Sequence, residues 1–160
     1  MSTINILCID DQRDVLATLR KDLTVFESHF NLIDCESAAE ARDAIEEIDQ
    51  EGSYLALLIC DHLMPKKNGI DFLIEMHEDS RFSKTKKLLL TGMATHKDTI
   101  EAINMADIDR YIEKPWDEEE LVHIVKELLT QFILSIGIEY QPYLNLLDQP
   151  TLLKILKDRT

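Results

Sequence analysis

The apolar residues of this chain alternate between two spacings. Short unbroken apolar runs predict buried strands, and each run is followed by a stretch with an apolar residue at every third or fourth position, which predicts an amphipathic helix. The pattern occurs five times, and the predicted strands cover residues 4–9, 30–35, 55–60, 88–90 and 110–113. Two of the helices have clear first residues, because Ser37 and Glu40 form a capping-box pair and Asp117 is a typical N-cap.

These five rounds predict an α/β fold. Strands that are apolar on both faces and joined by helices form a parallel sheet with helices on both sides and right-handed crossovers. We expect a doubly wound, flavodoxin-like sheet of five strands in the order 2-1-3-4-5, followed by an extended C-terminal helix and a short helical tail. From 160 residues we expect one domain over residues 1–130, with residues 131–160 as a helical extension or linker. That strand order opens a crevice where strands 1 and 3 end.

Acidic residues follow both strands that border this crevice. Asp10 and Asp11 come directly after the first strand, and Asp61 comes after the third. One such Asp is usually a turn or cap residue, but three carboxylates at one edge repel one another unless a cation is bound. Because few carboxylates converge and the sequence has no Gly-bearing calcium loop, Mg²⁺ is favoured, with Mn²⁺ as the alternative ion, and a phosphate ligand is implied.

Two further polar residues stand at the ends of the fourth and fifth strands. Thr91 follows the fourth, and Lys114 follows the fifth, directly before Pro115. A strand-end Thr is often a cap and a Lys is often a surface residue, but the place of Lys114 directs it toward the crevice. A metal ion, a hydroxyl and an ammonium group around one carboxylate supply the charge neutralisation and positioning that phosphoryl transfer requires.

Charge and composition restrict the partners of the protein. Seventeen basic against 31 acidic residues give a net charge of -14, so we expect neither direct nucleic-acid binding nor membrane binding. The nearest approach to a basic patch, between Arg81 and Lys87, is interpreted as a solvated connection. Three cysteines, each within an apolar run, predict reduced buried thiols and a cytoplasmic protein. The sequence contains no signal-peptide pattern and no apolar run long enough to cross a membrane.

The residues at these strand ends resemble the receiver domain of bacterial two-component response regulators, which has the chemotaxis-regulator-like fold. The resemblance covers the chain from about Ile4 to Leu129. The segments that carry it are Ile9-Asp10-Asp11, Asp61-His62-Leu63-Met64-Pro65 with Gly69, Thr91-Gly92, and Tyr111-Ile112-Glu113-Lys114-Pro115.

The resemblance implies a role for each residue of the site. Asp61 is expected to be the phosphoacceptor, served by a sensor histidine kinase or a phosphotransfer protein. The protein is then not an enzyme in the usual sense, but a phosphoacceptor that assists its own phosphorylation and dephosphorylation. The other implied roles are Mg²⁺ binding by Asp10, Asp11, Asp61 and the backbone carbonyl of Leu63, phosphoryl binding by Thr91 and Lys114, and a cis bond between Lys114 and Pro115.

The resemblance also implies how the signal is read out. After phosphorylation, Thr91 moves inward and Tyr111 rotates into the vacated space, which changes the surface formed by the fourth helix, fifth strand and fifth helix. The alternative for Tyr111 is an ordinary half-buried strand aromatic. Leu63 and Met93 flank the path of an attacking water and are both apolar, so a long-lived phosphorylated form is expected.

Three other functions compete with that of a phosphorylated receiver. A haloacid-dehalogenase-type phosphatase needs a second Asp two positions after its nucleophile, but Gln12 stands there and the chain has no length for a cap domain. A nucleotide-binding Rossmann domain needs clustered glycines, and the four glycines are scattered. A receiver-like interaction module that is never phosphorylated is the alternative left open. The five histidines lie apart, so no metal-binding or phosphotransfer histidine is expected.

The last predicted helix is apolar on two sides. One stripe covers the sheet, and a second stripe includes Val122, Leu129, Ile133 and Ile136. The second stripe either pairs in a homodimer through this helix or is covered by residues 140–156 folding back within one chain. The tail is too short for an output domain, so the sequence is either a stand-alone regulator or the front of a longer protein.

Overall fold

The structure, a computed structural model, describes residues 2–92 and 96–159. The strands are β1 (Ile4–Ile9), β2 (Asn31–Cys35), β3 (Tyr54–Asp61), β4 (Lys86–Thr91) and β5 (Arg110–Glu113). The α-helices are α1 (Arg13–Asp22), α2 (Ala38–Gln50), α3 (Gly69–Glu78), α4 (Lys97–Ala106), α5 (Glu118–Ile136) and α6 (Gln149–Asp158). Short 3₁₀ helices are η1 (Thr24–Phe26), η2 (Ser80–Phe82) and η3 (Gln141–Leu146).

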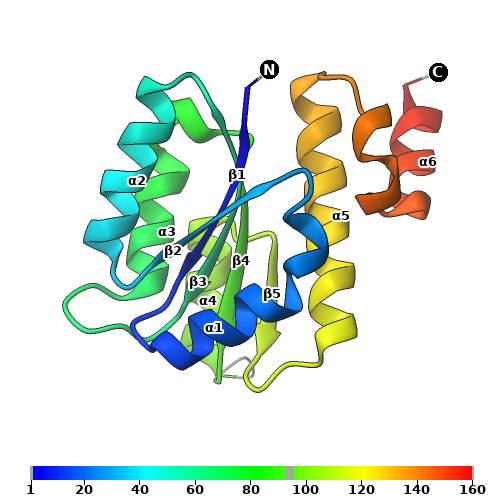
Figure 1. Ribbon diagram of the computed structural model, residues 1–160. Helices are drawn as coiled ribbons and strands as arrows, with labels where there is room; N and C mark the ends of the chain where they lie inside the picture. Colours follow the sequence, from blue (N-terminus) through cyan, green and yellow to red (C-terminus); the bar gives the residue numbers. More distant parts are fainter. Residues whose placement is uncertain (1, 93–95, 160) are drawn as a thin grey trace.

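The five strands form one parallel sheet in the order β2-β1-β3-β4-β5. Helices cover both faces, with α2 and α3 on one side and α1 and α5 on the other (Figure 1). The predicted fold class and strand order are therefore confirmed. The order places the ends of β1 and β3 side by side in the middle of the sheet, where the crevice was expected.

Alternation along the strands builds two cores from one sheet. In β1, Ile6 and Cys8 pack into the cluster shared with α1 and α5, whereas Leu7 and Ile9 pack into the cluster shared with α2 and α3. All four are fully buried. Because side chains of a strand point alternately to opposite faces, an unbroken apolar run is what a sheet covered on both sides requires.

The helix starts follow the predicted caps. The Ser37 hydroxyl accepts a hydrogen bond from the backbone N–H of Glu40, and the Glu40 carboxylate accepts one from the N–H of Glu36, so the return half of the box reaches one residue further back. Asp117 likewise accepts from the N–H of Glu120. Helix α5 ends at Gly137, whose φ of 74° is the left-handed conformation that glycine adopts without strain.

The segment between Arg81 and Lys87 corrects an expectation. It is not a solvated connection, because Lys86 and Lys87 begin β4 and Lys87 is only 5% exposed. The backbone N–H of Lys87 donates to the carboxylate of Asp109, and burial lowers the pKa of the Lys87 ammonium. The long apolar stem of a lysine permits such burial, and a pattern of charges alone does not reveal it.

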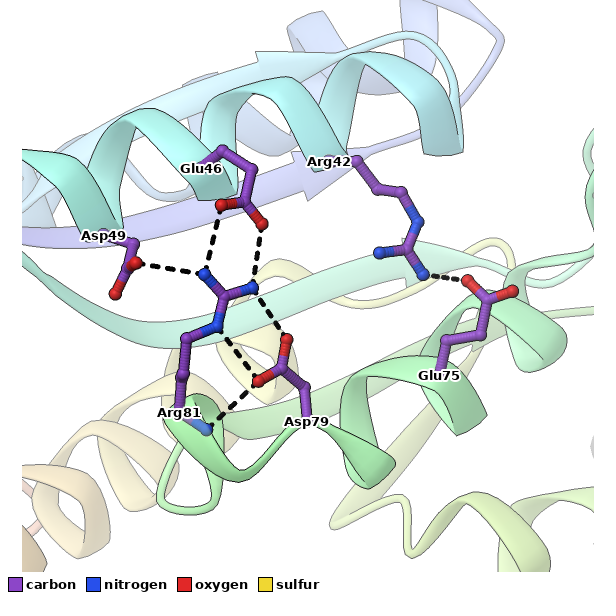
Figure 2. Close-up of polar contacts among 6 residues, drawn as sticks. All are labelled: Arg42, Glu46, Asp49, Glu75, Asp79 and Arg81. Atoms are coloured by element: carbon purple, nitrogen blue, oxygen red, sulfur yellow. Dashed lines mark hydrogen bonds and ion pairs between the residues drawn. The ribbon is translucent and has the colours of Figure 1, made fainter.

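Arg81 belongs to a surface network rather than to a free loop. Its guanidinium binds both oxygens of Glu46, one oxygen of Asp49 and both oxygens of Asp79, and thereby ties η2 to α2 (Figure 2). We call these four residues the Arg81 cluster. Beside it, Arg42 of α2 pairs with Glu75 of α3.

The tail folds back onto α5, which is the second of the two alternatives that the sequence left open for the second stripe. Leu129 and Ile133 are fully buried, and α6 lies along the outer side of α5 (Figure 1). Asp148 donates its backbone N–H to the Thr130 hydroxyl at 2.9 Å, and the ring of Tyr143 packs against that of Phe30. Leu129 and Ile133 are therefore covered within one chain, whereas Val122 and Ile136 of the same stripe are only partly buried.

The burial of the cysteines agrees with the sequence pattern. The three cysteines are free and buried, as the apolar runs around them predicted. Burial raises the thiol pKa in each case, to about 12 for Cys35. Within the described residues, no helix is both long enough and apolar enough to cross a membrane.

Candidate functional site

Three carboxylates meet where β1 and β3 end. Asp10 follows β1 and is fully buried, Asp11 is exposed, and Asp61 is the last residue of β3 and 6% exposed. One oxygen of each lies within 4.8 Å of the others, and among residues 2–92 and 96–159 this is the one group of three acidic, His or Cys side chains with that spacing. The structure thus brings together the three residues that the strand ends predicted.

Lys114 joins this group from the loop after β5. Its ammonium lies 2.9 Å from Oδ2 of Asp10 and 2.8 Å from Oδ1 of Asp61. The bond between Lys114 and Pro115 is cis, as the resemblance implied. Asp10 is held from a second side, because its Oδ1 accepts the backbone N–H of Gln12 at 2.9 Å. We call Asp10, Asp11, Asp61 and Lys114 the crevice cluster.

Burial dominates the electrostatics of Asp61. It raises the pKa of Asp61, the nearby charges of Asp10 and Asp11 raise it further, and the hydrogen bond and charge of Lys114 only partly oppose this. Burial acts on Lys114 in the direction of a lower pKa, but its bonds to Asp61 and Asp10 outweigh it and the pKa is raised. The ammonium stays charged, while the carboxylates around it lack full neutralisation.

The donor set fits a hard divalent cation. Carboxylate oxygens are the ligands that Mg²⁺ prefers, and three carboxylates against one ammonium leave an excess of negative charge for a cation to offset. Leu63, whose carbonyl was expected to assist, lies in the loop after β3, two residues beyond Asp61, with a side chain that is 58% exposed. Met93, the other residue expected to flank the water path, lies outside the described residues.

Thr91 is the last residue of β4 and is almost fully buried. Its hydroxyl lies 2.9 Å from Nδ1 of His62, the residue directly after Asp61. Burial lowers the pKa of His62 and so disfavours the charged form of this ring. The sequence pattern did not indicate this contact. The histidines have no metal-ligand spacing, and a single histidine next to the expected phosphoacceptor carries no signal of its own.

Tyr111 lies on the edge strand β5 and is 46% exposed. It pairs in register with Leu89 of β4. In this arrangement the phenol ring is therefore at the surface, on the strand next to the one that carries Thr91.

A backbone contact shapes the loop after Asp61. Gly69 begins α3, and a Cβ atom there would lie 1.8 Å from the carbonyl oxygen of Asp61. The N–H of Gly69 donates to the carbonyl of His62 at 2.9 Å, and the Asn68 side chain caps the helix. Only glycine permits so close an approach, which explains physically why Gly69 stands in the segment that carries the resemblance.

The chain matches the model of a known protein family. The family model of the response regulator receiver domain matches residues 6–126. The chain belongs to this family. Receiver domains are the phosphorylation-controlled signalling domains of two-component systems, and are not enzymes of the classical kind.

Curated relatives of this receiver domain are regulatory proteins. The transcriptional regulatory protein CpxR of Escherichia coli K12 is 32% identical over 124 residues, which is 78% of this chain and 48% of CpxR. The response regulator Rre1 of Synechocystis is 30% identical over 128 residues. The hydrogenase transcriptional regulatory protein HoxA of Bradyrhizobium diazoefficiens is 29% identical over 130 residues. The receiver chain spans between a quarter and about half of the length of these relatives.

Solved structures show the same fold. The signal receiver domain of an HD domain-containing protein from Pseudomonas fluorescens is 26% identical, with a TM-score of 0.71 over 86% of this chain and 96% of that one. A CheY-like receiver domain protein from Methanospirillum hungatei is 25% identical, with a TM-score of 0.69 over 84% of this chain and 99% of that one. The likeness spans nearly all of each of these neighbours.

Proposed function

We propose that this receiver domain accepts a phosphoryl group on Asp61 from a phosphohistidine of a sensor histidine kinase or phosphotransfer protein. The observation that carries the proposal is the crevice cluster, in which three carboxylates converge and one ammonium lies within 3 Å of both Asp10 and Asp61. Buried ionisable groups with a perturbed pKa, such as Asp61, gather at functional sites.

The chemistry is a transfer from nitrogen to oxygen. A carboxylate oxygen of Asp61 attacks the phosphorus in line, so an O–P bond forms while the P–N bond breaks, and the electron pair of that bond returns to the imidazole of the partner. Lys114 and Thr91 then bind the phosphoryl oxygens. Mg²⁺ held by Asp10, Asp11, Asp61 and the Leu63 carbonyl supplies further neutralisation of phosphoryl charge when it is bound.

The output surface is the face formed by α4, β5 and α5. Ile100 and Met105 on α4 and Tyr111 on β5 are large apolar side chains that are at least 46% exposed. Such side chains at one face are typical of a protein-binding surface. Movement of the Thr91 hydroxyl toward the phosphoryl group, followed by rotation of Tyr111, changes this face and thereby carries the signal.

The test is phosphorylation by a small-molecule donor. Incubation with acetyl phosphate and Mg²⁺ is expected to add one phosphate to the wild type and none to Asp61→Asn, as measured by intact mass. Omission of Mg²⁺ with added chelator is expected to prevent the addition. Trp116, which follows the Lys114-Pro115 turn and donates its indole N–H to Asp22, provides a fluorescence signal for the same reaction.

Two outcomes would contradict the proposal. Equal phosphate addition to the wild type and to Asp61→Asn would show that another residue is the acceptor. Absence of addition from both acetyl phosphate and a histidine kinase would favour the receiver-like interaction module that is never phosphorylated.

A further inference from the structure

His62 and Thr91 form a buried polar pair beside the phosphoacceptor. Nδ1 of His62 lies 2.9 Å from Oγ1 of Thr91, and the two residues are 6% and 1% exposed. The backbone reinforces the pair, because the N–H of His62 donates to the carbonyl of Leu90, the residue before Thr91. The pair therefore joins the end of β3 to the end of β4 at both side-chain and main-chain level.

On its other side His62 borders open space. The residue lines a pocket of about 340 Å³ between α3 and α4, together with Asn68, the N-cap of α3, and Asp98 and Thr99 of α4. The hold on Thr91 therefore comes from the side-chain hydrogen bond and from the main-chain bond of His62 to Leu90.

Phosphoryl oxygens are hydrogen-bond acceptors, so Thr91 can bind a phosphoryl group on Asp61 only when its hydroxyl oxygen comes within hydrogen-bond distance of that group. In the structure this oxygen lies 2.9 Å from Nδ1 of His62, in a bond whose donor depends on the tautomer of the ring, while Asp61 pairs with Lys114. In either tautomer the bond holds the oxygen beside His62, and movement of the oxygen toward Asp61 breaks it.

We propose that His62 is a positioning residue that holds the Thr91 hydroxyl in the resting arrangement, so that Thr91 must leave His62 before it can bind the phosphoryl group. The inference rests on the proposed function, because it takes Thr91 as a ligand of the phosphoryl group. A buried hydrogen bond that has to be broken weakens phosphoryl binding, and the strength of this bond therefore sets how readily the receiver domain switches.

The test compares two variants of nearly the same shape. His62→Leu removes the hydrogen-bonding atom, whereas His62→Asn places an amide oxygen or nitrogen near the position of Nδ1. The probe is fluoroberyllate with Mg²⁺, a mimic of the phosphoryl group, and the readout is its dissociation constant from Trp116 fluorescence. We expect His62→Leu to bind the probe roughly two- to tenfold more tightly than the wild type, and His62→Asn to return to within about twofold of it.

A second background isolates the hydroxyl. Thr91→Val keeps the shape of the side chain and removes the oxygen, so it is expected to weaken fluoroberyllate binding by itself. In that background His62→Leu should have no further effect, because the bond it removes is already absent. If His62→Leu does not fold, His62→Phe keeps a ring without the nitrogen and replaces it in both backgrounds.

The outcomes separate the two proposals. If Thr91→Val binds the probe as tightly as the wild type, the role of Thr91 in the proposed function is wrong. If Thr91→Val binds more weakly but His62→Leu leaves affinity unchanged or lowers it, the positioning role of His62 is wrong while the proposed function stands. Equal tightening by His62→Leu and His62→Asn would also overturn the inference, because only lost packing changes both alike.

Discussion

The Arg81 cluster and the crevice cluster each combine three carboxylates with one cationic side chain, and they differ in burial and in the type of cation. In the Arg81 cluster the guanidinium reaches all three carboxylates at the surface, two of them through both oxygens. In the crevice cluster the Lys114 ammonium contacts Asp10 and Asp61 within a largely buried site. A planar guanidinium offers five donors in a fixed fork, whereas an ammonium is a point charge.

The consequence is visible in the carboxyl groups. Hydrogen bonds from Arg81 lower the pKa of Glu46 and of Asp79. Burial raises the pKa of Asp61 in spite of Lys114. The charged forms of Glu46 and Asp79 are thus stabilised at the surface, whereas burial disfavours the charged form of Asp61 in the crevice. The two clusters hold the same number of carboxylates, so burial and the type of cation, and not the number of acidic residues, account for the opposite pKa shifts.

The largest expected effect on stability comes from removing the ammonium group of Lys114. Lys114→Met leaves Asp10 and Asp61 buried without their shared partner, and we expect a loss of roughly 3 kcal/mol in the free energy of unfolding. Mg²⁺ should restore much of this loss, because it neutralises the same carboxylates. Urea unfolding with and without Mg²⁺ measures both effects. A variant whose stability does not respond to Mg²⁺ would show that the crevice is not a cation site.

The second-largest expected effect comes from the close approach of the Gly69 backbone to the carbonyl oxygen of Asp61. Gly69→Ala places a Cβ atom against the carbonyl of Asp61, and we expect a destabilisation of roughly 2–3 kcal/mol from overpacking. Gly92→Ala is the matched control, since no atom of the described residues lies within 4 Å of its Cβ position, and its effect on stability is expected to stay within about 0.5 kcal/mol. Equal losses in the two variants would contradict the close backbone approach as the cause.

A third prediction uses the opposite pKa shifts of the two clusters. The pKa of Asp61 is raised in the folded state. At any pH above the ordinary pKa of an aspartate, ionisation of Asp61 therefore lowers the stability of the folded protein. Asp61→Asn removes this charge and should stabilise the protein at neutral pH. That gain should shrink as the pH falls through the raised pKa. Glu46 is the reverse case, because its pKa is lowered. Glu46→Gln should destabilise at neutral pH, with a difference that disappears in acid as Glu46 becomes protonated.

Thermal unfolding across this pH range measures both variants. The comparison of clusters would be wrong if Asp61→Asn and Glu46→Gln changed stability in the same direction at neutral pH.

The smallest effect concerns the Arg81 cluster. Arg81→Lys keeps the charge and loses the fork, and we expect a slight fall in melting temperature that high salt abolishes, because exposed ion pairs contribute little and are screened. Phosphate addition from acetyl phosphate should be unchanged. A loss of phosphorylation in Arg81→Lys would mean that the two clusters are coupled and not independent.

Much of the fold follows from the sequence because its signals are local. The run from Ile4 to Ile9 became β1 with the predicted ends, and Ser37 and Asp117 begin their helices as predicted. An apolar run requires burial on both faces, and a cap residue acts on the turn that follows it. The convergence of Asp10 and Asp61 was likewise predictable, since the strand order brings the ends of β1 and β3 together.

Tertiary structure decided what depends on contacts between distant segments. The sequence alone could not decide what covers Leu129 and Ile133, because no residue near them in the chain does. In the structure they are buried by the residues after Gly137, which include α6. From its charge alone Lys87 is expected at the surface. In the structure it is buried, and its backbone N–H donates to Asp109.

The contact between His62 and Thr91 belongs to the same class. The two residues are 29 positions apart, and no periodicity links them. The sequence by itself determined the sheet, its order and the acidic edge of this protein. Which side chains face one another across that edge was decided only by packing, because a hydrogen bond depends on the distance between two atoms and not on their spacing in the chain.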